Sequence, residues 1–415
     1  MDLAIMGYGV VGSGVAQLLH QNYESIVARS MQPSLRLKYI LDLRAFPGDP
    51  YGHLVIRDVQ TILEDPEVGI VVETMGGLHP AFAFVLACLE AGKSVVTSNK
   101  ELVAAKGYEL LEAARAHNVN FLFEASVGGG IPILRPLSQC LAANKITEVA
   151  GILNGTTNFI LTRMFEDDMP FPAALRLAQE NGYAEKDPTA DIEGHDACRK
   201  ICILAALAFG RHVYPEQVRT EGISSLRAED VACASAGGFA IKLLGRAVRL
   251  PDGRISATVA PALVPHSCLL ANVSDVYNAI LVRGDAIGDV IFYGRGAGKL
   301  PTASAVVADI IDCGKHVQHR KFFGWDPADP AFVAPAEEDV SAFYIRTVCA
   351  LAFDLEAAKA ALLRQFPGVR WLERPGAAPG ELAFLLPPAV ESEARAALAE
   401  NFDVQPETVL RVIEF

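Results

Sequence analysis

Charged residues crowd one short stretch of this chain, from Gly182 to Lys200. Eight of its 19 residues are charged, in a protein that is 20% charged overall. The stretch runs directly into the apolar segment 201–209, which predicts a buried helix. Carboxylates and a lysine at the mouth of a buried helix cost desolvation free energy, which a fold tolerates where the charges are paired or handle a substrate. The stretch therefore offers a proton donor and several carboxylates.

Asp196 and Lys200 have the most informative spacing within this stretch. They lie four residues apart at the start of the predicted helix 196–209, so both side chains occupy one helix face. A solvated ion pair of this kind contributes about 0.3–0.5 kcal/mol and needs no further role. The buried helix and the acid-rich loop before it favour the alternative, in which Lys200 protonates a substrate oxygen. Glu185 or Asp191 would then bind the ammonium group of an amino acid.

Glycines near the N-terminus follow the spacing of a dinucleotide-binding turn. The apolar run 3–6 leads into G-x-G-x-x-G at Gly7, Gly9 and Gly12, and a helix-forming pattern follows. Gly7 permits the tight turn, Gly9 lets the backbone approach a pyrophosphate, and Gly12 allows close helix–strand packing. Strand patterns at 37–41, 69–73 and 94–97 and a helix pattern at 80–91 continue the alternation. The sequence thus predicts a Rossmann-type domain, with a glycine turn that binds no ligand as the alternative.

Two residues near the end of the second predicted strand bear on the choice of cofactor. An acid at Asp42 would accept hydrogen bonds from an adenosine ribose and repel a 2′-phosphate, which favours NAD. Arg44 could instead bind that phosphate, so NADP stays open. After the strand 94–97, Lys100 either begins a surface helix or lies near the nicotinamide and the substrate's carboxylate.

Composition limits the class of protein. At 415 residues the chain should hold two or three domains, and its apolar content of 51% is typical of a well-buried fold. The net charge of −13 argues against a nucleic-acid or anionic-membrane surface. No apolar run reaches the roughly 18–20 residues that span a bilayer, and the eight scattered cysteines favour reduced core thiols over a zinc site. We expect a cytoplasmic protein.

Six motifs, in chain order, resemble those of the homoserine dehydrogenase family and cover residues 1 to about 318. They lie at residues 7–12, 98–101, 123–132, 151–158, 182–200 and 294–305. The resemblance implies an enzyme that interconverts L-homoserine and L-aspartate 4-semialdehyde by hydride transfer with NAD(P)H. It implies that Lys200 donates the proton to the aldehyde oxygen and that Glu185 and Asp196 bind homoserine. Asp191 and Thr156 would lie beside the substrate.

The same resemblance assigns residues to the cofactor and to a cation. Lys100 would contact both cofactor and substrate, and the remaining cofactor contacts would come from Gly7, Gly9, Val10, Val11, Gly12, Asp42, Ser98 and Gly182. A monovalent cation such as sodium would be held by Glu124 with the carbonyl groups of Val127, Gly129 and Ile131. Carbonyl oxygens suit a hard monovalent cation better than zinc, although Glu124 could also be a bare carboxylate at a strand end.

The predicted fold class is α/β, in several parts. A Rossmann domain would span 1–126, completed by a helix within 300–318, and an α+β catalytic and dimerisation domain would span 127–299. After a Pro- and Ala-rich linker at 319–339, residues 340–415 follow the order βαββαβ, which resembles an ACT regulatory domain with a ferredoxin-like sheet. The usual Asp-x-Pro-Gly effector motif is replaced by Ala-Leu-Ala-Phe-Asp at 350–354. An L-threonine effector site and a structural role in a homodimer or homotetramer both stay open.

Overall fold

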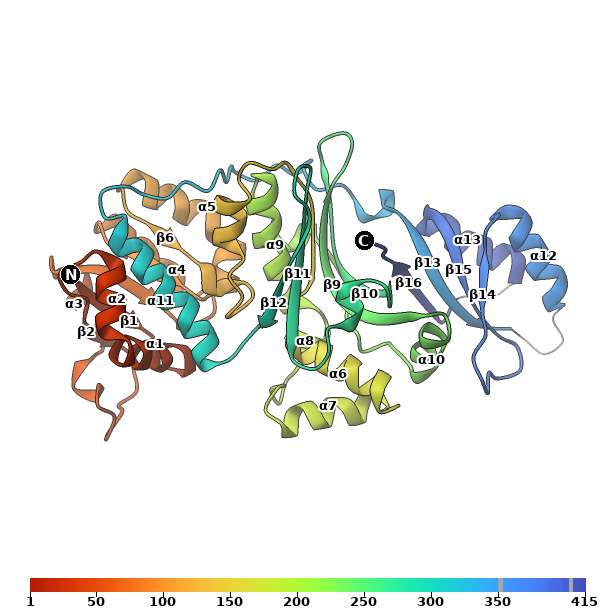
Figure 1. The fold of residues 1–415 in the computed structure, drawn as a ribbon, viewed down its shortest axis with the longest axis horizontal. Coiled ribbons are helices and arrows are strands. Elements are labelled where there is room, and N and C mark those ends of the chain that lie inside the picture. The colour runs from red at the N-terminus through yellow and green to blue at the C-terminus, as the bar shows by residue number, and fades with distance from the viewer. Residues whose placement is uncertain (350–353, 403–405) are drawn as a thin grey trace. The chain divides into compact units, whose positions relative to one another are not determined.

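The computed structural model divides the chain into two compact units (Figure 1). It describes residues 1–349, 354–402 and 406–415. The first unit comprises residues 1–147, 202–215 and 282–329, and the second comprises 148–201, 216–281 and 330–415. Among the described residues, no helix combines the length and the apolar content that crossing a membrane requires.

A parallel sheet forms the centre of the first unit. Its strands lie in the order β3-β2-β1-β4-β5-β6, and each pairs in parallel with its neighbours. They are β1 (Asp2–Met6), β2 (Arg36–Leu41), β3 (Val55–Ile56), β4 (Val68–Glu73), β5 (Ser94–Thr97) and β6 (Phe121–Leu122). This order is that of a doubly wound Rossmann domain, which confirms the predicted fold class.

Helices from both ends of the first unit cover this sheet. One set packs through a shared apolar core with strands β1, β4 and β5, and consists of α1 (Val10–Gln21), α2 (Tyr23–Ser30) and α11 (Lys299–Lys315). The others are α3 (Gln60–Leu63), α4 (Ala81–Glu90) and α5 (Lys100–Ala116), of which α4 and α5 pack against each other and against strands β4 to β6. Helix α11 lies where a helix was predicted within 300–318.

A mixed sheet has most, but not all, of its strands in the second unit. Its path is β12-β11-β7-β9-β10-β16-β13-β15-β14, with β8 pairing to β10. The strands before the C-terminal region are β7 (Ile146–Ile152), β8 (Arg219–Thr220), β9 (Phe239–Arg249), β10 (Ile255–Pro265), β11 (Tyr277–Gly284) and β12 (Gly288–Arg295). The helices are α6 (Gly155–Glu166), α7 (Phe171–Glu180), α8 (Thr189–Ile192), α9 (His195–Phe209) and α10 (Ala228–Ala236).

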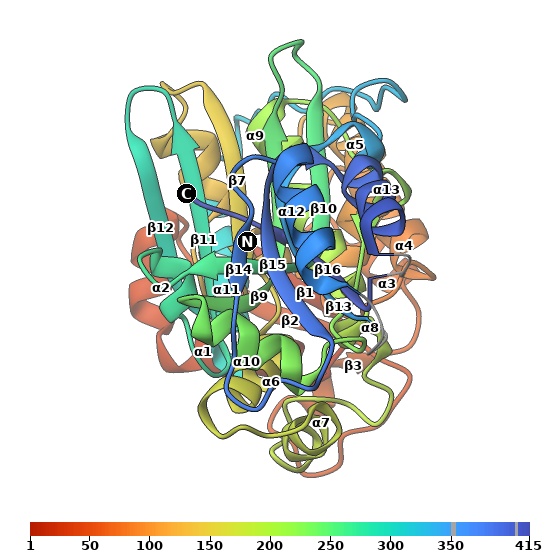
Figure 2. The ribbon, with the colours of Figure 1, turned by 90° about the vertical axis from the view of Figure 1, so that its right-hand side faces the viewer.

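The C-terminal part of the second unit has the predicted element order. Its members are β13 (Val340–Val348), α12 (Leu355–Gln365), β14 (Arg370–Leu372), β15 (Glu381–Val390), α13 (Glu391–Phe402) and β16 (Thr408–Val412). The strands pair antiparallel in the order β16-β13-β15-β14, as in a ferredoxin-like sheet. Both helices cover one face of this sheet (Figure 2), where Phe384 and Leu362 belong to a common core. The altered effector motif falls mostly on residues 350–353, which lie outside the described residues.

Strand β16 also joins the C-terminal sheet to the rest of the second unit. It pairs in parallel with β10, through the partners Ala262–Arg411 and Leu263–Val412. Nearby, Asp230 of α10 is fully buried and forms an ion pair with Arg346 of β13, with Nε 2.7 Å from Oδ1. The C-terminal strands are therefore part of one continuous sheet, which the sequence did not predict.

The predicted linker is packed at its first half. Trp325 is 7% exposed, and its indole N–H donates to Nδ1 of His212 at 3.1 Å. Its ring packs edge-on against Phe123 with ring centroids 5.8 Å apart, and an added Cβ on Gly107 would lie 3.1 Å from the Trp325 ring.

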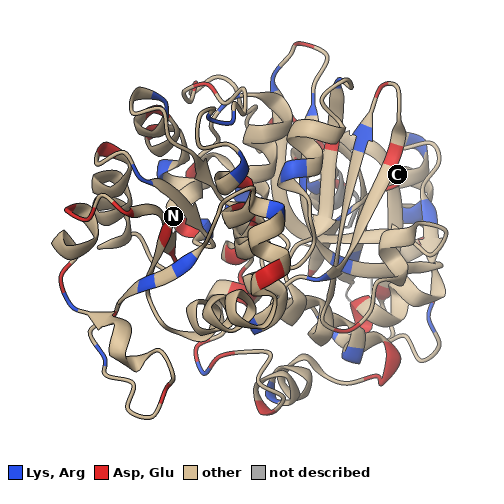
Figure 3. Cartoon of the chain, turned by 60° about the vertical axis from the view of Figure 1, so that its left-hand side comes forward, with Lys and Arg blue, Asp and Glu red and all other residues tan. Residues whose placement is uncertain are grey.

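On the side drawn in Figure 3, basic and acidic segments are interspersed along the ribbon.

Candidate active site

Lys200 and Asp196 form a buried pair on α9. The Nζ of Lys200 donates to Oδ2 of Asp196 and to the carbonyl oxygen of Leu153, each at 2.7 Å. Lys200 is 7% exposed and Asp196 is 4% exposed, so this is not the solvated surface pair that the spacing alone allowed. An ammonium group is a donor only, and these two acceptors orient it.

Asn154 brings together the carboxylates around Lys200. It precedes α6, where its Oδ1 accepts from the backbone N–H of Thr157 at 2.9 Å as a helix N-cap. Its Nδ2 donates to Oδ1 of Asp191 at 2.7 Å and to Oδ2 of Asp196 at 2.8 Å. The predicted residues Asp191, Asp196 and Lys200 are thus brought together. No role was predicted for Asn154, although an asparagine between a strand and a helix is a cap signal.

The loop after α7 contains Gly182 and Glu185, and the predicted substrate residue Thr156 of α6 bonds to it. Thr156 donates its hydroxyl to the carbonyl oxygen of Tyr183 at 2.6 Å, which fastens this loop to α6. Gly182 has a φ of 71°, a left-handed conformation that favours glycine, and it is exposed. Glu185 is also exposed, and its carboxylate forms no hydrogen bond with any described residue. It does not join the Asn154 cluster.

The glycine turn after β1 has the shape that a dinucleotide needs. Gly7 has a φ of 93°, and an added Cβ would lie 2.8 Å from the backbone nitrogen of Met75. A Cβ on Gly12 would lie 2.1 Å from the carbonyl oxygen of Gly7. By contrast, a Cβ on Gly9 would meet open space, and Val10 at the start of α1 is 67% exposed. The open helix N-terminus therefore fits a pyrophosphate.

Asp42 is held in place at the end of β2. One oxygen, Oδ2, accepts from the backbone N–H of Tyr8 at 2.8 Å and from Arg44 at 2.8 Å. The other accepts from the backbone and side chain of Arg44, each at 3.0 Å. The Arg44 guanidinium holds the pKa of this carboxyl far below its usual value. Asp42, which favours NAD, and Arg44, which could bind the 2′-phosphate of NADP, are therefore paired with each other.

A buried carboxylate organises the carboxyl edge of β4 and β5. Glu73 is fully buried and accepts from the hydroxyl of Thr97 at 2.5 Å and from the backbone N–H of Met75 at 2.8 Å. Burial raises its pKa. Asn99, which caps α5, donates to the carbonyl oxygen of Gly77 at 2.6 Å. Half-buried Ser98 and Lys100 flank this cap, at the edge where such folds bind ligands.

The carboxylate of Glu124 has partners of its own. Its oxygens accept the backbone N–H groups of Ile133, Leu134 and Arg135 at 2.7–2.9 Å. Glu124 is 4% exposed, and its own N–H donates to Asp309 at 2.8 Å. A cation here would have to be bound chiefly by carbonyl oxygens. Among the described residues, no group of three or more His, Cys, Asp or Glu side chains could hold a metal ion.

Family models match most of the chain. The model described as "Homoserine dehydrogenase, NAD binding domain" matches residues 7–124, and that described as "Homoserine dehydrogenase" matches residues 132–311. The homoserine dehydrogenase of a Synechocystis strain is 42% identical over 84% of this chain and 83% of its own length. That of Bacillus subtilis is 39% identical over 76% of this chain and 73% of its own.

Solved structures agree with these relatives. The crystal structure of a homoserine dehydrogenase from Thiobacillus denitrificans covers 100% of this chain and 98% of its own, at 36% identity and a TM-score of 0.88. The enzyme from S. aureus gives 31% identity and a TM-score of 0.82 over the same shares. The chain belongs to the homoserine dehydrogenase family, the NAD(P)-dependent oxidoreductases that interconvert L-homoserine and L-aspartate 4-semialdehyde.

Proposed function

We propose that Lys200 is the proton donor of this reaction. Reduction of the semialdehyde adds a hydride to the aldehyde carbon and a proton to its oxygen, and bound NAD(P)H supplies the hydride. The observation that carries the proposal is the burial of Lys200 between Asp196 and the carbonyl of Leu153. These acceptors orient the ammonium group, which donates one proton to the aldehyde oxygen. In the oxidative direction the neutral amine accepts the hydroxyl proton of homoserine.

The carboxylates beside Lys200 would bind the ammonium group of the substrate. Asp196 and Asp191, joined by Asn154, present negative charge at one place, which suits an amino-acid cation. Glu185 would bind the same cation from the exposed loop, and Thr156 would lie beside the substrate at the first turn of α6.

The first unit would bind the cofactor. Gly7, Gly9, Val10, Val11 and Gly12 would surround the pyrophosphate, while Ser98, Lys100 and Gly182 complete the contacts. Asp42 favours NAD, because a 2′-phosphate would meet its carboxylate, whereas Arg44 supports NADP. A hyperthermophilic archaeal homoserine dehydrogenase that is 27% identical has been solved in complex with NADPH. Comparison of kcat/KM for NAD and NADP decides this choice. A strong preference for NADP would refute the proposal that Asp42 makes NAD the preferred cofactor.

A monovalent cation such as sodium would order the loop after Glu124. Because the Glu124 carboxylate is occupied by backbone N–H groups, the carbonyl oxygens of Val127, Gly129 and Ile131 would supply most ligands. Turnover in sodium or potassium buffers, compared with a tetramethylammonium buffer, tests this site.

The C-terminal region would be an ACT-like domain that follows a Rossmann domain (1–126, with 300–318), a catalytic domain (127–299) and a linker (319–339). Its antiparallel βαββαβ sheet supports this assignment. This domain would either bind L-threonine as an effector or have a structural role in a cytoplasmic homodimer or homotetramer. Adding L-threonine to the activity assay distinguishes the two roles. Clear inhibition would favour the effector.

Replacement of Lys200 by Ala tests the main proposal. We expect NAD(P)-linked turnover of homoserine to fall by at least about 100-fold, because the proton donor is lost. NAD(P)H binding, measured by cofactor fluorescence, should stay near that of the unaltered protein. Unchanged turnover would remove Lys200 from the mechanism.

A further inference from the structure

Lys242 is a buried lysine that the proposed chemistry does not use. It lies on β9 and is 5% exposed. Its Nζ donates to the carbonyl oxygen of Val273 at 2.7 Å and to Oδ1 of Asn158 at 3.2 Å, and no carboxylate of a described residue forms an ion pair with it. Burial lowers its pKa to about 8. Glu166 acts on this ammonium group only by a charge interaction without direct contact, and because burying such a group is costly in a protein interior, its retention calls for a reason.

Asn158 of α6 completes the arrangement. It is 1% exposed, and its Nδ2 donates to the carbonyl oxygens of Val273, Asp275 and Tyr277 at 3.0–3.1 Å. Its oxygen meanwhile accepts from Lys242. One amide group therefore holds three alternate residues of the segment 273–277, and Lys242 binds both the amide and the first of these residues.

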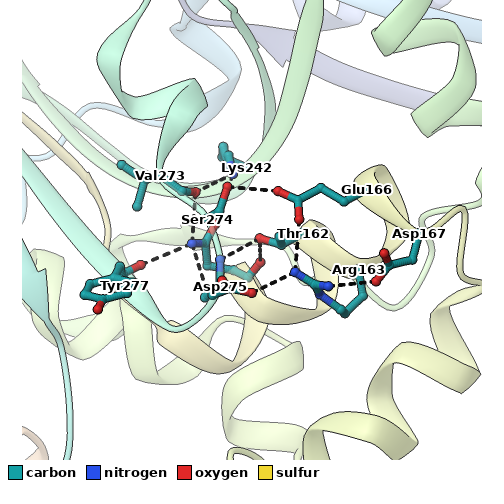
Figure 4. A network of polar contacts seen from close by, with 10 residues as sticks. Thr162, Arg163, Glu166, Asp167, Lys242, Val273, Ser274, Asp275 and Tyr277 are labelled. Atoms are coloured by element: carbon teal, nitrogen blue, oxygen red, sulfur yellow. Dashed lines mark hydrogen bonds and ion pairs between the residues drawn. The ribbon is translucent and has the colours of Figure 1, made fainter.

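Later turns of α6 fasten the same segment (Figure 4). The hydroxyl oxygen of Thr162 accepts from the backbone N–H of Asp275 at 3.0 Å, and Arg163 donates to the Asp275 carboxylate at 2.8 Å. Ser274 donates its hydroxyl to Glu166 at 3.2 Å. Segment 273–277 is thus bonded along α6 from Asn158 to the C-terminal end of the helix.

The segment also supports the first turn of α6. A Cβ on Gly155 would lie 2.7 Å from the carbonyl oxygen of Val276, so the two backbones touch with no room for a side chain. Asn154, the residue before Gly155, is the one that holds Asp191 and Asp196. A shift of segment 273–277 would therefore move the turn that places these carboxylates.

We propose that Lys242 and Asn158 form a positioning pair, which fixes segment 273–277 under the first turn of α6 and so places Asn154 for homoserine binding. The inference rests on the proposed roles of Asp196 and Lys200. The hydrogen bonds of the pair lie within the second unit, so its loss should act on homoserine kinetics and leave the binding of NAD(P)H unchanged.

Three variants test the pair: Lys242→Met, Asn158→Leu and the double variant. We expect each single change to raise the KM for homoserine by about tenfold or more, with a smaller fall in kcat and an NAD(P)H dissociation constant within about twofold. The double variant should be no worse than the more damaged single one, because coupled residues are not additive. Lys242→Arg, which keeps donors and charge, should recover part of the loss. Lys359→Met, which alters a partly exposed lysine paired with Glu356 in the C-terminal region, is the control.

The outcomes separate this inference from the proposed site. An unchanged homoserine KM in folded Lys242→Met and Asn158→Leu would overturn the positioning pair, even if Lys200→Ala is inactive. Equal losses in homoserine and NAD(P)H binding would also overturn it, since they indicate general loosening. Should Lys242→Met fail to fold, Asn158→Ser, which removes the amide but keeps a polar side chain, gives the same readouts. If Lys200→Ala keeps full activity, the proposed site itself fails.

Discussion

The Nζ of Lys200 lies 2.7 Å from Oδ2 of Asp196, one turn earlier on the same helix, and both side chains are buried. Asn154 donates to the same Oδ2 at 2.8 Å. This oxygen is therefore shared by a cation and an amide, which fixes the orientation of the lysine. A carboxylate so placed has a second function available, because its charge can also attract the substrate's ammonium group.

Neutralising this carboxylate should damage substrate binding more than cofactor binding. For Asp196→Asn we expect kcat/KM for homoserine to fall by about 100-fold, because a charged partner of both Lys200 and the substrate is lost. Asp187→Asn is the control, since Asp187 is exposed and bonds Thr189 in the same loop. Equal effects of the two changes would contradict the assignment.

The choice of cofactor should respond to the charge on Asp42. Asp42→Asn keeps an acceptor for the Tyr8 N–H but removes the negative charge and loosens the pair with Arg44. We expect the ratio of kcat/KM for NADP to that for NAD to rise by about tenfold. Initial rates with both cofactors measure it, and a ratio that does not move would show that Asp42 does not discriminate between them.

Acid should destabilise the first unit through His212. Burial lowers its pKa to about 4, and its Nδ1 accepts from Trp325. Between the ordinary pKa near 6.5 and about 4, the unfolded chain binds more protons than the folded chain, so stability falls as the pH falls through this window. At pH 5 this amounts to about 2 kcal/mol relative to pH 7.

His212→Gln should lose less stability between pH 7 and pH 5 than the unaltered protein. Urea unfolding followed by Trp325 fluorescence, in a Trp371→Phe background, measures the difference. His53→Gln, a change at an exposed histidine, should retain the pH dependence. An identical pH dependence in His212→Gln would rule out His212 as its source.

The ion pair between α10 and β13 should be sensitive to the loss of one partner. Arg346 is 2% exposed, and its removal in Arg346→Met leaves Asp230 buried without its cation. We expect a loss of about 3–5 kcal/mol in the free energy of unfolding, measured in urea. Arg254→Met, at a surface pair with Asp252, should cost at most about 1 kcal/mol. A small effect at Arg346 would mean that water reaches Asp230.

Elements with their own local pattern were predictable from the sequence. The strand predicted at 94–97 has the bounds of β5, and the order βαββαβ predicted for residues 340–415 is the order of the six C-terminal elements. The buried pair of Asp196 and Lys200 could be singled out because its charges stand out against an apolar helix. Asn154 gave no such signal, because its partners Asp191 and Asp196 come from a different segment. Lys242 likewise has the pattern of an ordinary strand residue. Its acceptors, Asn158 and Val273, are distant in the sequence and come close to it only in the folded protein.

The parallel pairing of Leu263 with Val412 bears on how the protein is made. During synthesis β10 leaves the ribosome long before β16. Until β16 has emerged, the backbone groups of β10 that pair with it, at Ala262 and Leu263, have no strand partner on that side. Contacts between such distant residues close a long loop and slow folding. During this interval the exposed edge of β10 can pair with a strand of another chain, which is a route to aggregation. The second unit should thus complete its folding late, once β16 has emerged.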